Sequence, residues 1–181
     1  MSLRVLNNEP AWDTHQDETK SFSKICFIPS LGLSCFGCCG HHFGSKDAIH
    51  KFMAKNKRTL NRFLSSDKTH KEFMEREKLL DACGGCHSLI REKQPEGHTA
   101  YVCAVHPLRI GGEDVRVGYC DHDYLCKTAG HVNKMTDEEK TLFYDFLAEQ
   151  QFDSYTYSII NSQETVLLKQ YRDWKEKRNN H

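Results

Sequence analysis

The densest run of cysteines in the chain reads Cys35-Phe36-Gly37-Cys38-Cys39-Gly40. A C-x-x-C turn brings two thiolates to one ion, and backbone N–H groups of the turn can donate hydrogen bonds to the sulfurs. Neighbouring side chains of an extended segment point in opposite directions. We therefore expect Cys38 and Cys39 to serve different metals or different faces of one cluster.

The other cysteines lie on both sides of this run. Cys26 precedes it, and five more follow it: Cys83, Cys86, Cys103, Cys120 and Cys126. In a reducing compartment, clumped cysteines bind metal or do redox work more often than they form disulfides. A single isolated cysteine is more often a small buried hydrophobic residue. The clustering favours metal, and two four-ligand sites would use eight of the nine cysteines.

The composition of the 181 residues suits one domain with a thin core. Lys plus Arg and Asp plus Glu both number 25, so no net charge attracts nucleic acid or acidic lipid. Apolar residues make up roughly 40% when Gly is counted and Tyr is not, against the usual 45–50%. We expect a bound metal to help hold such a chain together.

No apolar run is long enough to span a membrane. The richest stretch, residues 25–39, is interrupted by Pro29, Gly32 and Gly37. Acidic residues follow Met1 within a few positions, and no signal-peptide pattern is visible. The sequence therefore predicts a cytoplasmic protein without a membrane segment.

The chain divides into an N-terminal arm and one cysteine-cluster domain. Residues 1–24 are polar and aperiodic, which is typical of an arm or loop. Residues 25–181 form the domain, and its first part, residues 25–44, should be irregular because helices do not tolerate that glycine density.

Helices are expected after this segment. Ser45 can cap a helix that ends near Leu64, and Ser65-Ser66-Asp67 can cap a second that ends near Leu80. Short β-like pieces, Thr99–Val105 and Val115–Tyr119, follow, joined by turn residues such as Gly111-Gly112.

Two further helices are expected near the C-terminus. Thr136-Asp137-Glu138-Glu139 is a capping box that opens one of them, and Ser154–Lys177 reads as the other. Together they would form a two-helix clasp over residues 136–177. The predicted fold is mainly α with small irregular β elements, its helices surrounding a cysteine-rich, metal-organised loop centre.

The order of the cysteines resembles the YkgJ-type cysteine-cluster family, described as a zinc- or iron-chelating domain. The second half of its C-x-x-C-x-x-C-C opening is matched by Cys35, Cys38 and Cys39, and Cys26 stands for its first cysteine across a longer spacer. The later elements of the family order are matched by Cys86-His87-Ser88-Leu89, Cys103 with His106-Pro107, Cys120 and Cys126.

The resemblance implies metal or iron–sulfur binding. The metal ligands it implies are Cys26, Cys35, Cys38, Cys39, Cys86, Cys103, Cys120 and Cys126. Cys83 is then the odd thiol. A related domain occurs in flagellin lysine methylases, so the resemblance leaves a catalytic role open.

The segment Cys83-Gly84-Gly85-Cys86-His87 allows two other interpretations. It matches the c-type haem attachment motif, with Met135 as an axial ligand, but that attachment requires export. It could also be a dithiol redox site, but such sites follow a buried strand, and residues 77–82 read as a helix end. We favour neither.

The histidines and the basic runs are expected to be solvated surface residues. His41-His42 could complete a Cys₃His zinc site, but a solvent-exposed loop pair is favoured. The same interpretation is favoured for His106 and His122. Lys55-Asn56-Lys57-Arg58 and residues 175–178 lack interleaved aromatics, so nucleic acid is not the expected partner.

Both zinc and a [4Fe–4S] cluster accept an all-sulfur ligand set, and we choose zinc with the cluster as the alternative. A catalytic zinc keeps an open position and a nearby general base. The acids nearest the cysteines, Asp81, Asp121 and Asp123, sit in no recognised catalytic spacing. We therefore expect a structural, accessory or interaction module with a protein partner. The rival is an iron–sulfur redox or methyltransferase-associated enzyme.

Overall fold

The computed structural model describes residues 24–40, 44–80, 85–94, 97–111, 113–120, 126–163 and 165–180. The protein is mainly helical with two small antiparallel sheets, which confirms the coarse fold prediction. The predicted arm, apart from Lys24, lies outside the described residues.

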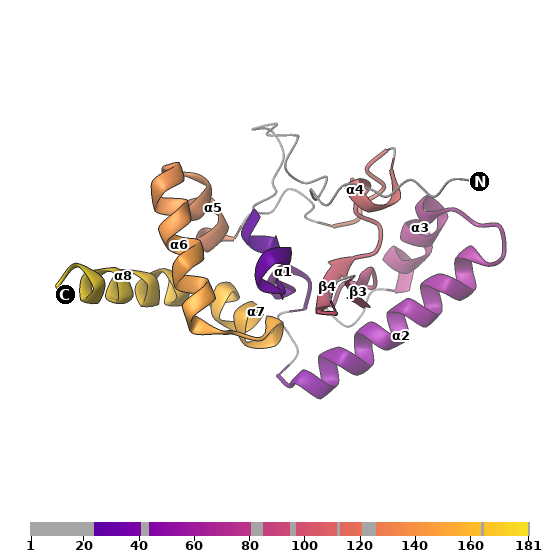
Figure 1. Ribbon diagram of the computed structural model, residues 1–181. Coiled ribbons are helices and arrows are strands. Elements are labelled where there is room, and N and C mark those ends of the chain that lie inside the picture. Colours follow the sequence, from indigo (N-terminus) through magenta and orange to yellow (C-terminus); the bar gives the residue numbers. More distant parts are fainter. Residues whose placement is uncertain are drawn as a thin grey trace, which may run out of the picture.

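Short elements come first and are followed by longer helices on either side of a β-hairpin. In chain order they are η2 (Lys24–Cys26), β1 (Phe27–Ile28), η3 (Pro29–Leu31), β2 (Leu33–Ser34), α1 (Gly37–Gly40), α2 (Lys46–Leu64), α3 (His70–Leu80), β3 (Leu89–Lys93), β4 (Thr99–Cys103), α4 (Pro107–Ile110), α5 (Lys127–Asn133), α6 (Asp137–Gln150), α7 (Ser154–Ser162) and α8 (Val166–Asn179). Figure 1 shows α5, α6 and α8 on one side, α2, α3, β3 and β4 on the other, and α1 between them.

Side-chain caps mark the starts of α2 and α3. The Ser45 hydroxyl accepts from the Ala48 N–H at 3.2 Å and starts α2 as predicted. The start of α3 differs from the prediction, because Thr69 and Glu72 form its capping box. Ser65 instead ends α2, donating its backbone N–H to the Asn61 carbonyl.

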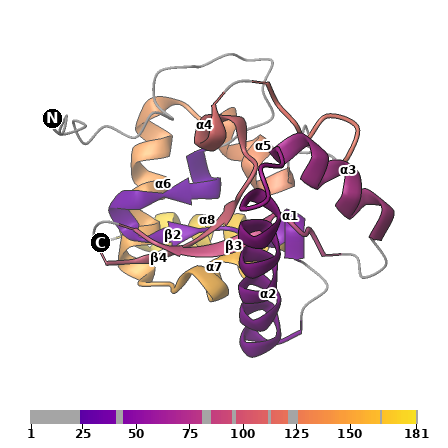
Figure 2. The same ribbon diagram turned by 90° about the vertical axis from the view of Figure 1, so that its right-hand side faces the viewer.

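The larger sheet is a β-hairpin, and the sequence predicted only its second strand. β4 falls within the predicted Thr99–Val105 and pairs antiparallel with β3, placing Leu89 opposite Cys103. Val115–Tyr119 was predicted as β-like, but this segment is a series of turns in which the Tyr119 N–H donates to the Arg116 carbonyl. In Figure 2 the hairpin lies behind α2, which packs on β3.

The predicted final helix is two helices. α7 ends at Ser162, and α8 begins after Thr165, whose φ of 67° is left-handed. A β-branched residue rarely adopts that conformation, so no local signal marked the break. The capping box at Thr136 does open α6, with Thr136 accepting from the Glu139 N–H at 3.2 Å. Three helices therefore occupy residues 136–177 where two were predicted, and their role as a clasp stays a prediction.

Buried apolar side chains form three clusters. The helical cluster is Ile25, Ile28, Leu33, Ala129, Val132, Met135, Phe143, Phe146, Leu147, Tyr157, Leu167, Leu168 and Tyr171. The hairpin cluster is Leu60, Phe63, Phe73, Met74, Ile90, Ala104 and Val105. The central cluster is Phe36, Ile49, Met53, Leu89 and Tyr101. The core is thus divided into three parts, which the sequence did not predict.

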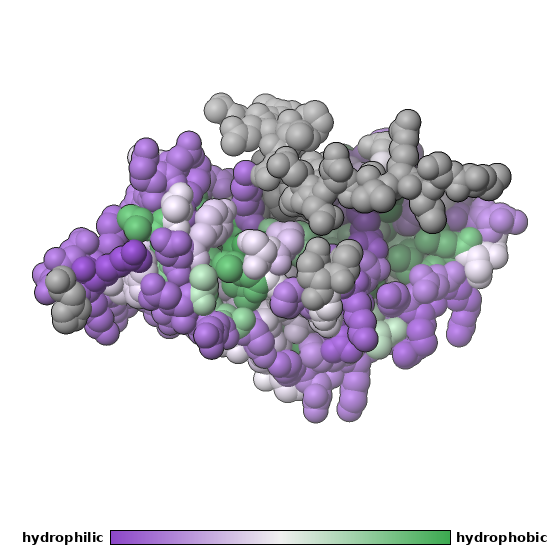
Figure 3. Space-filling view, viewed as in Figure 1, coloured by the Kyte–Doolittle hydropathy of each residue, from purple (hydrophilic) through white to green (hydrophobic). Residues whose placement is uncertain are grey.

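The outer surface is polar. The face in Figure 3 is largely hydrophilic, with small hydrophobic areas between the charged residues. Within the described part of the chain, no helix combines the length and apolar character needed to cross a bilayer.

Buried serines join α7 to the segment that carries the first cysteines. The Ser34 and Phe36 N–H groups donate to the hydroxyls of Ser154 and Ser158, both at 3.0 Å. The Ser34 hydroxyl in turn accepts from the Tyr101 N–H of β4 at 2.7 Å. Because buried backbone donors need acceptors, these bonds fix β2 between α7 and the hairpin.

Replacing Ser158 with Ala should destabilise the protein by about 1–3 kcal/mol, because the buried Phe36 N–H loses its acceptor. Ser162→Ala is the matched control on the same helix, since the Ser162 hydroxyl is exposed and bonds the Ile159 carbonyl. Its effect should stay within about 0.5 kcal/mol. Urea unfolding measures both, and equal effects would contradict the role given to Ser158.

Asp153 should give a pH dependence of stability. Burial works to raise its pKa, but hydrogen bonds from Lys46 Nζ and the Thr156 N–H outweigh it and lower the pKa from 3.8 to about 2. A depressed folded pKa means that the stabilisation is complete above about pH 4 and is lost as the pH falls towards 2. In Asp153→Asn, which keeps the cap, thermal unfolding between pH 4 and 2 should show a smaller loss than wild type. Parallel curves would contradict this.

Candidate metal centre

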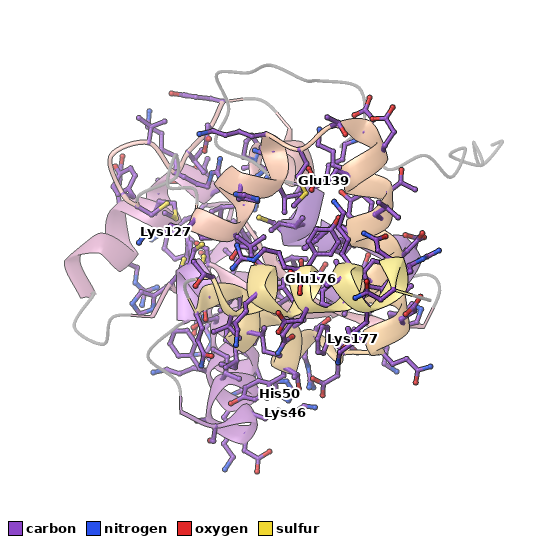
Figure 4. All side chains as sticks on the ribbon, turned by 90° about the vertical axis from the view of Figure 1, so that its left-hand side faces the viewer. Lys46, His50, Lys127, Glu139, Glu176 and Lys177 are labelled. Carbon is purple, nitrogen blue, oxygen red and sulfur yellow. The ribbon has the colours of Figure 1, made fainter. Side chains whose placement is uncertain are left out.

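Eight of the nine cysteines fall within the described residues, and all eight are free thiols. Cys26 ends η2, Cys35 follows β2, Cys38 and Cys39 lie in α1, Cys86 precedes β3, Cys103 ends β4, Cys120 closes the turns after Arg116, and Cys126 caps α5. Several yellow sulfur atoms are drawn beside Lys127, the residue after Cys126, in Figure 4. Cys83 lies outside the described residues.

The thiols of Cys38 and Cys126 act on each other's pKa: their interaction raises the pKa of Cys38 and lowers the pKa of Cys126 to about 6. Cys35 and Cys26 are close enough to raise the pKa of Cys38 further. The Cys35 N–H also donates to the Cys26 carbonyl at 2.9 Å. We call Cys26, Cys35, Cys38 and Cys126 the first thiol group.

A second set surrounds Cys39. Its thiol and that of Cys86 are hydrogen-bonded, which raises the pKa of Cys39 and lowers the pKa of Cys86 to about 7. Burial, and then the neighbouring Cys86, raise the pKa of Cys103 to about 12, and Cys120 acts on Cys103 in the same direction. The Cys86 N–H donates to the Cys39 carbonyl at 2.9 Å. Cys39, Cys86, Cys103 and Cys120 form the second thiol group.

Two of these sulfurs accept hydrogen bonds from backbone N–H groups two or three residues further on. Cys35 accepts from the Gly37 N–H at 3.3 Å, and Cys126 accepts from the Ala129 N–H at 3.4 Å. Charge strengthens such bonds, so this turn suits a thiolate better than a neutral thiol. Both turns belong to the first thiol group.

Asn161 of α7 adds a side-chain donor to the first group. Its Nδ2 donates to Cys35 Sγ at 3.2 Å, while its Oδ1 is buried without a hydrogen-bond partner among the described residues. Sequence reasoning missed Asn161, although it stands one turn after Tyr157 on the buried face of α7. Burial raises the pKa of Cys35 despite this bond.

A guanidinium lies at the second group. Arg116 interacts with Cys103 and Cys120. Its side chain also donates to both carboxylate oxygens of Asp114, at 2.8 and 2.6 Å. The two thiol groups therefore differ in their surroundings, an amide beside the first and a paired guanidinium beside the second.

Of the histidines considered as metal ligands, His106 lies within the described residues. His41, His42 and His122 lie outside the described residues. Burial, and then the charge of Arg116, lower the pKa of His106 to about 4, so its imidazole is neutral at pH 7.

The thiols are paired, but their sulfurs do not form a complete ligand set. Among the described residues, no three or more His, Cys, Asp and Glu side chains are placed together as ligands of one ion. The predicted metal-organised centre therefore stays a prediction, although the free thiols supply the donor chemistry that zinc and iron–sulfur clusters require.

Comparisons with known proteins add no relative. No family model, no curated protein and no solved structure matches this chain. The YkgJ-type resemblance rests on the order of the cysteines alone.

Gly37 should be required for the close packing of α1 against α7. A Cβ at this position would lie 2.7 Å from Ser162 Cβ and 3.3 Å from the Ser158 carbonyl oxygen, so Gly37→Ala must push α1 away from α7. We expect a loss of about 1–3 kcal/mol by overpacking. Gly44→Ala is the control, because nothing lies within 4 Å of its Cβ. Chemical denaturation compares the two, and a neutral Gly37→Ala would contradict the packing.

Proposed function

We propose that this protein binds metal through its clustered cysteine thiolates, with zinc as the ion, and acts as a structural, accessory or interaction module in the cytoplasm. The observation that carries the proposal is that eight free thiols come from segments far apart in sequence and that five of them pack against the three core clusters. These five are Cys35, Cys39, Cys86, Cys103 and Cys126.

The hydrogen bonding favours metal over buried hydrophobic cysteines. A neutral thiol packed as a small apolar side chain needs no N–H donors, whereas a metal thiolate is oriented and stabilised by them. Cys35 and Cys126 have such donors from their own turns, and Cys35 has Asn161 in addition.

The divided core favours a structural role for the metal. Cys35 and Cys126 pack against the helical cluster, Cys39 and Cys86 against the central cluster, and Cys103 against the hairpin cluster. Metal bonds among these cysteines would cross-link clusters that are individually small. Structural zinc contributes to folding in this way in other small domains.

The alternative is an iron–sulfur protein with redox or methyltransferase-associated activity. Two adjacent cysteines, Cys38 and Cys39, fit a polynuclear centre because each thiolate can address a different iron. The YkgJ-type resemblance supports zinc and iron equally. We place zinc first because it explains a stabilising role without redox chemistry.

Protein purified without oxygen should contain zinc in stoichiometric amount and show no visible absorbance, as measured by elemental analysis and spectroscopy. Cys38→Ser should abolish or greatly weaken the cooperative thermal transition, because it removes a ligand of a structural metal. Cys83→Ser, which alters the expected odd thiol, should behave like wild type.

Other results have definite meanings. Bound iron with a visible band that disappears on reversible reduction would establish the alternative, since zinc has no accessible redox state. Protein that carries no metal and folds equally well with a chelator would refute both forms of the proposal.

A further inference from the structure

We infer that the solvent face of α2, together with the adjoining part of the hairpin, binds the phosphate backbone of a nucleic acid duplex without reading its sequence. The inference is independent of the proposed metal binding, because it uses none of the cysteines. It begins from the charge of α2. This helix holds six Lys and Arg residues and a single acidic residue, Asp47, in a chain whose net charge is zero.

Four of these cations form a straight stripe. Lys51, Lys55, Arg58 and Arg62 are exposed and follow one another at spacings of four, three and four residues. In an α-helix such residues fall within about 60° of one another, and the stripe is about 16 Å long. Hydrophilic side chains project along α2 at the lower right of Figure 3. The helix thus presents a line of positive charge to solvent.

The opposite face of α2 holds the stripe in place. Met53 and Leu60 are buried on this face, and so is Asn56. The Asn56 side-chain amide donates to the carbonyls of Cys86 and Leu89, at 3.1 and 2.8 Å. Because α2 is anchored to the start of the hairpin, the four cations keep their spacing on a fixed helix.

A hollow of about 550 Å³ extends the cationic surface from α2 onto the hairpin. Its lining residues are Lys57 of α2, Arg91, Glu92 and Lys93 of β3, and Thr99 of β4. Lysine, arginine and threonine side chains are common donors to phosphate oxygens. The hollow therefore adds three cations and a hydroxyl group beside the stripe.

The acidic residue of the hollow is already paired. The Glu92 carboxylate lies 2.5 Å from Arg109 Nη2 and 3.9 Å from Lys57 Nζ. Because the charge of Arg109 offsets that of Glu92, the lining of the hollow stays positive.

A chain of hydrogen bonds orients Arg91. Its Nη1 donates to His50 Nδ1 at 2.9 Å, and His50 is labelled on α2 in Figure 4. An arginine can only donate, so the proton of the neutral His50 ring lies on Nε2, which donates to the Tyr101 hydroxyl at 2.8 Å. The bond to His50 uses one of the five guanidinium N–H groups and leaves Arg91 exposed.

The basic run of α8 differs from the stripe. Lys175 and Arg178 lie 3.3 and 3.9 Å from the carboxylates of Glu139 and Glu149. Within the part of the chain that the structure describes, none of the four stripe cations has an ion-pair partner. The structure thus separates two basic runs that look alike in the sequence, and the stripe is the one whose charge is available to a partner.

The chemistry of this surface favours nucleic acid over a protein partner. The centre of a protein interface is rich in aromatic residues and depleted in lysine. Val117 is the one large hydrophobic side chain that is exposed among the described residues, and it lies in the turns before Cys120, on neither α2 nor the hairpin. Surfaces that bind nucleic acid are polar and strongly positive, as this one is.

The aromatic content favours a duplex over a single strand. Phe52, the one aromatic residue within positions 51–62, packs against the central cluster. Single strands are held largely by stacking of bases on aromatic side chains, whereas a duplex is held through its phosphates. The lack of interleaved aromatics in the sequence therefore argues against single strands and leaves a duplex backbone as a partner.

Titration of a fluorescent DNA duplex of arbitrary sequence and about 20 base pairs tests the inference, with the full chain as purified. Fluorescence anisotropy should give a dissociation constant of about 10 µM or less at about 50 mM NaCl. Between about 50 and 200 mM NaCl, the logarithm of the binding constant should fall against the logarithm of salt with a slope of about −4, as four phosphate contacts require.

A charge-matched pair of variants locates the surface. Lys55→Gln with Arg58→Gln should weaken binding at least about tenfold and reduce the slope by about two, because two phosphate contacts are lost. Arg172→Gln with Lys177→Gln is the control, since it removes the same charges from exposed positions of α8. It should bind within about twofold of wild type. Equal weakening by both variants would show that only net charge matters and would overturn the inference.

The hollow has a variant of its own. Arg91→Gln with Lys93→Gln changes two exposed side chains and should weaken binding as the stripe variant does. Unchanged affinity would overturn the part assigned to the hairpin. Circular dichroism checks that every variant is folded, which we expect because all the altered side chains are exposed.

Other polyanions identify the partner. An RNA duplex of the same length shows which nucleic acid supplies the backbone, and binding of either duplex supports the inference. Polyglutamate of matched charge, bound more tightly than both duplexes, would assign the surface to an acidic protein and overturn it. Absence of duplex binding at about 50 mM NaCl, or a slope near zero, would also overturn it.

Discussion

The arrangement of the cysteines depends on how α7 satisfies the backbone of the segment from Ser34 to Phe36. This segment is buried and has no long strand or helix to supply acceptors, so its N–H groups need other partners. Ser154 and Ser158, spaced one turn apart on α7, supply them, and the Ser34 hydroxyl extends the connection to β4. Cys35 and the turn α1 are thereby fixed between the helices and the hairpin.

The same placement explains why the thiols occur at the borders of the core. The buried apolar side chains fall into the separate helical, central and hairpin clusters, and five cysteines pack against them. Thiolate–metal bonds are stronger than an equal number of apolar contacts and do not require a large buried area. Metal bonds at the cysteines would thus compensate for the small apolar core.

Local signals in the sequence were sufficient for some elements and insufficient for others. Ser45 and Thr136 predicted helix starts because a cap bonds an N–H three residues away. The break at Thr165 was missed because its left-handed backbone has no marker in a threonine. β3 and the grouping of the thiols were missed because both depend on partners distant in sequence, such as Leu89 with Cys103. The eight ligands implied by the order of the cysteines stay a prediction.

The link between the two thiol groups bears on how such a module would work. Cys38 and Cys39 share a peptide bond, and Gly37, just before them, is held against α7 where no Cβ fits. A shift of α1 would therefore move Cys38 and Cys39 together. Cys38 is exposed, so a partner could contact this turn directly, which suits the interaction module proposed above.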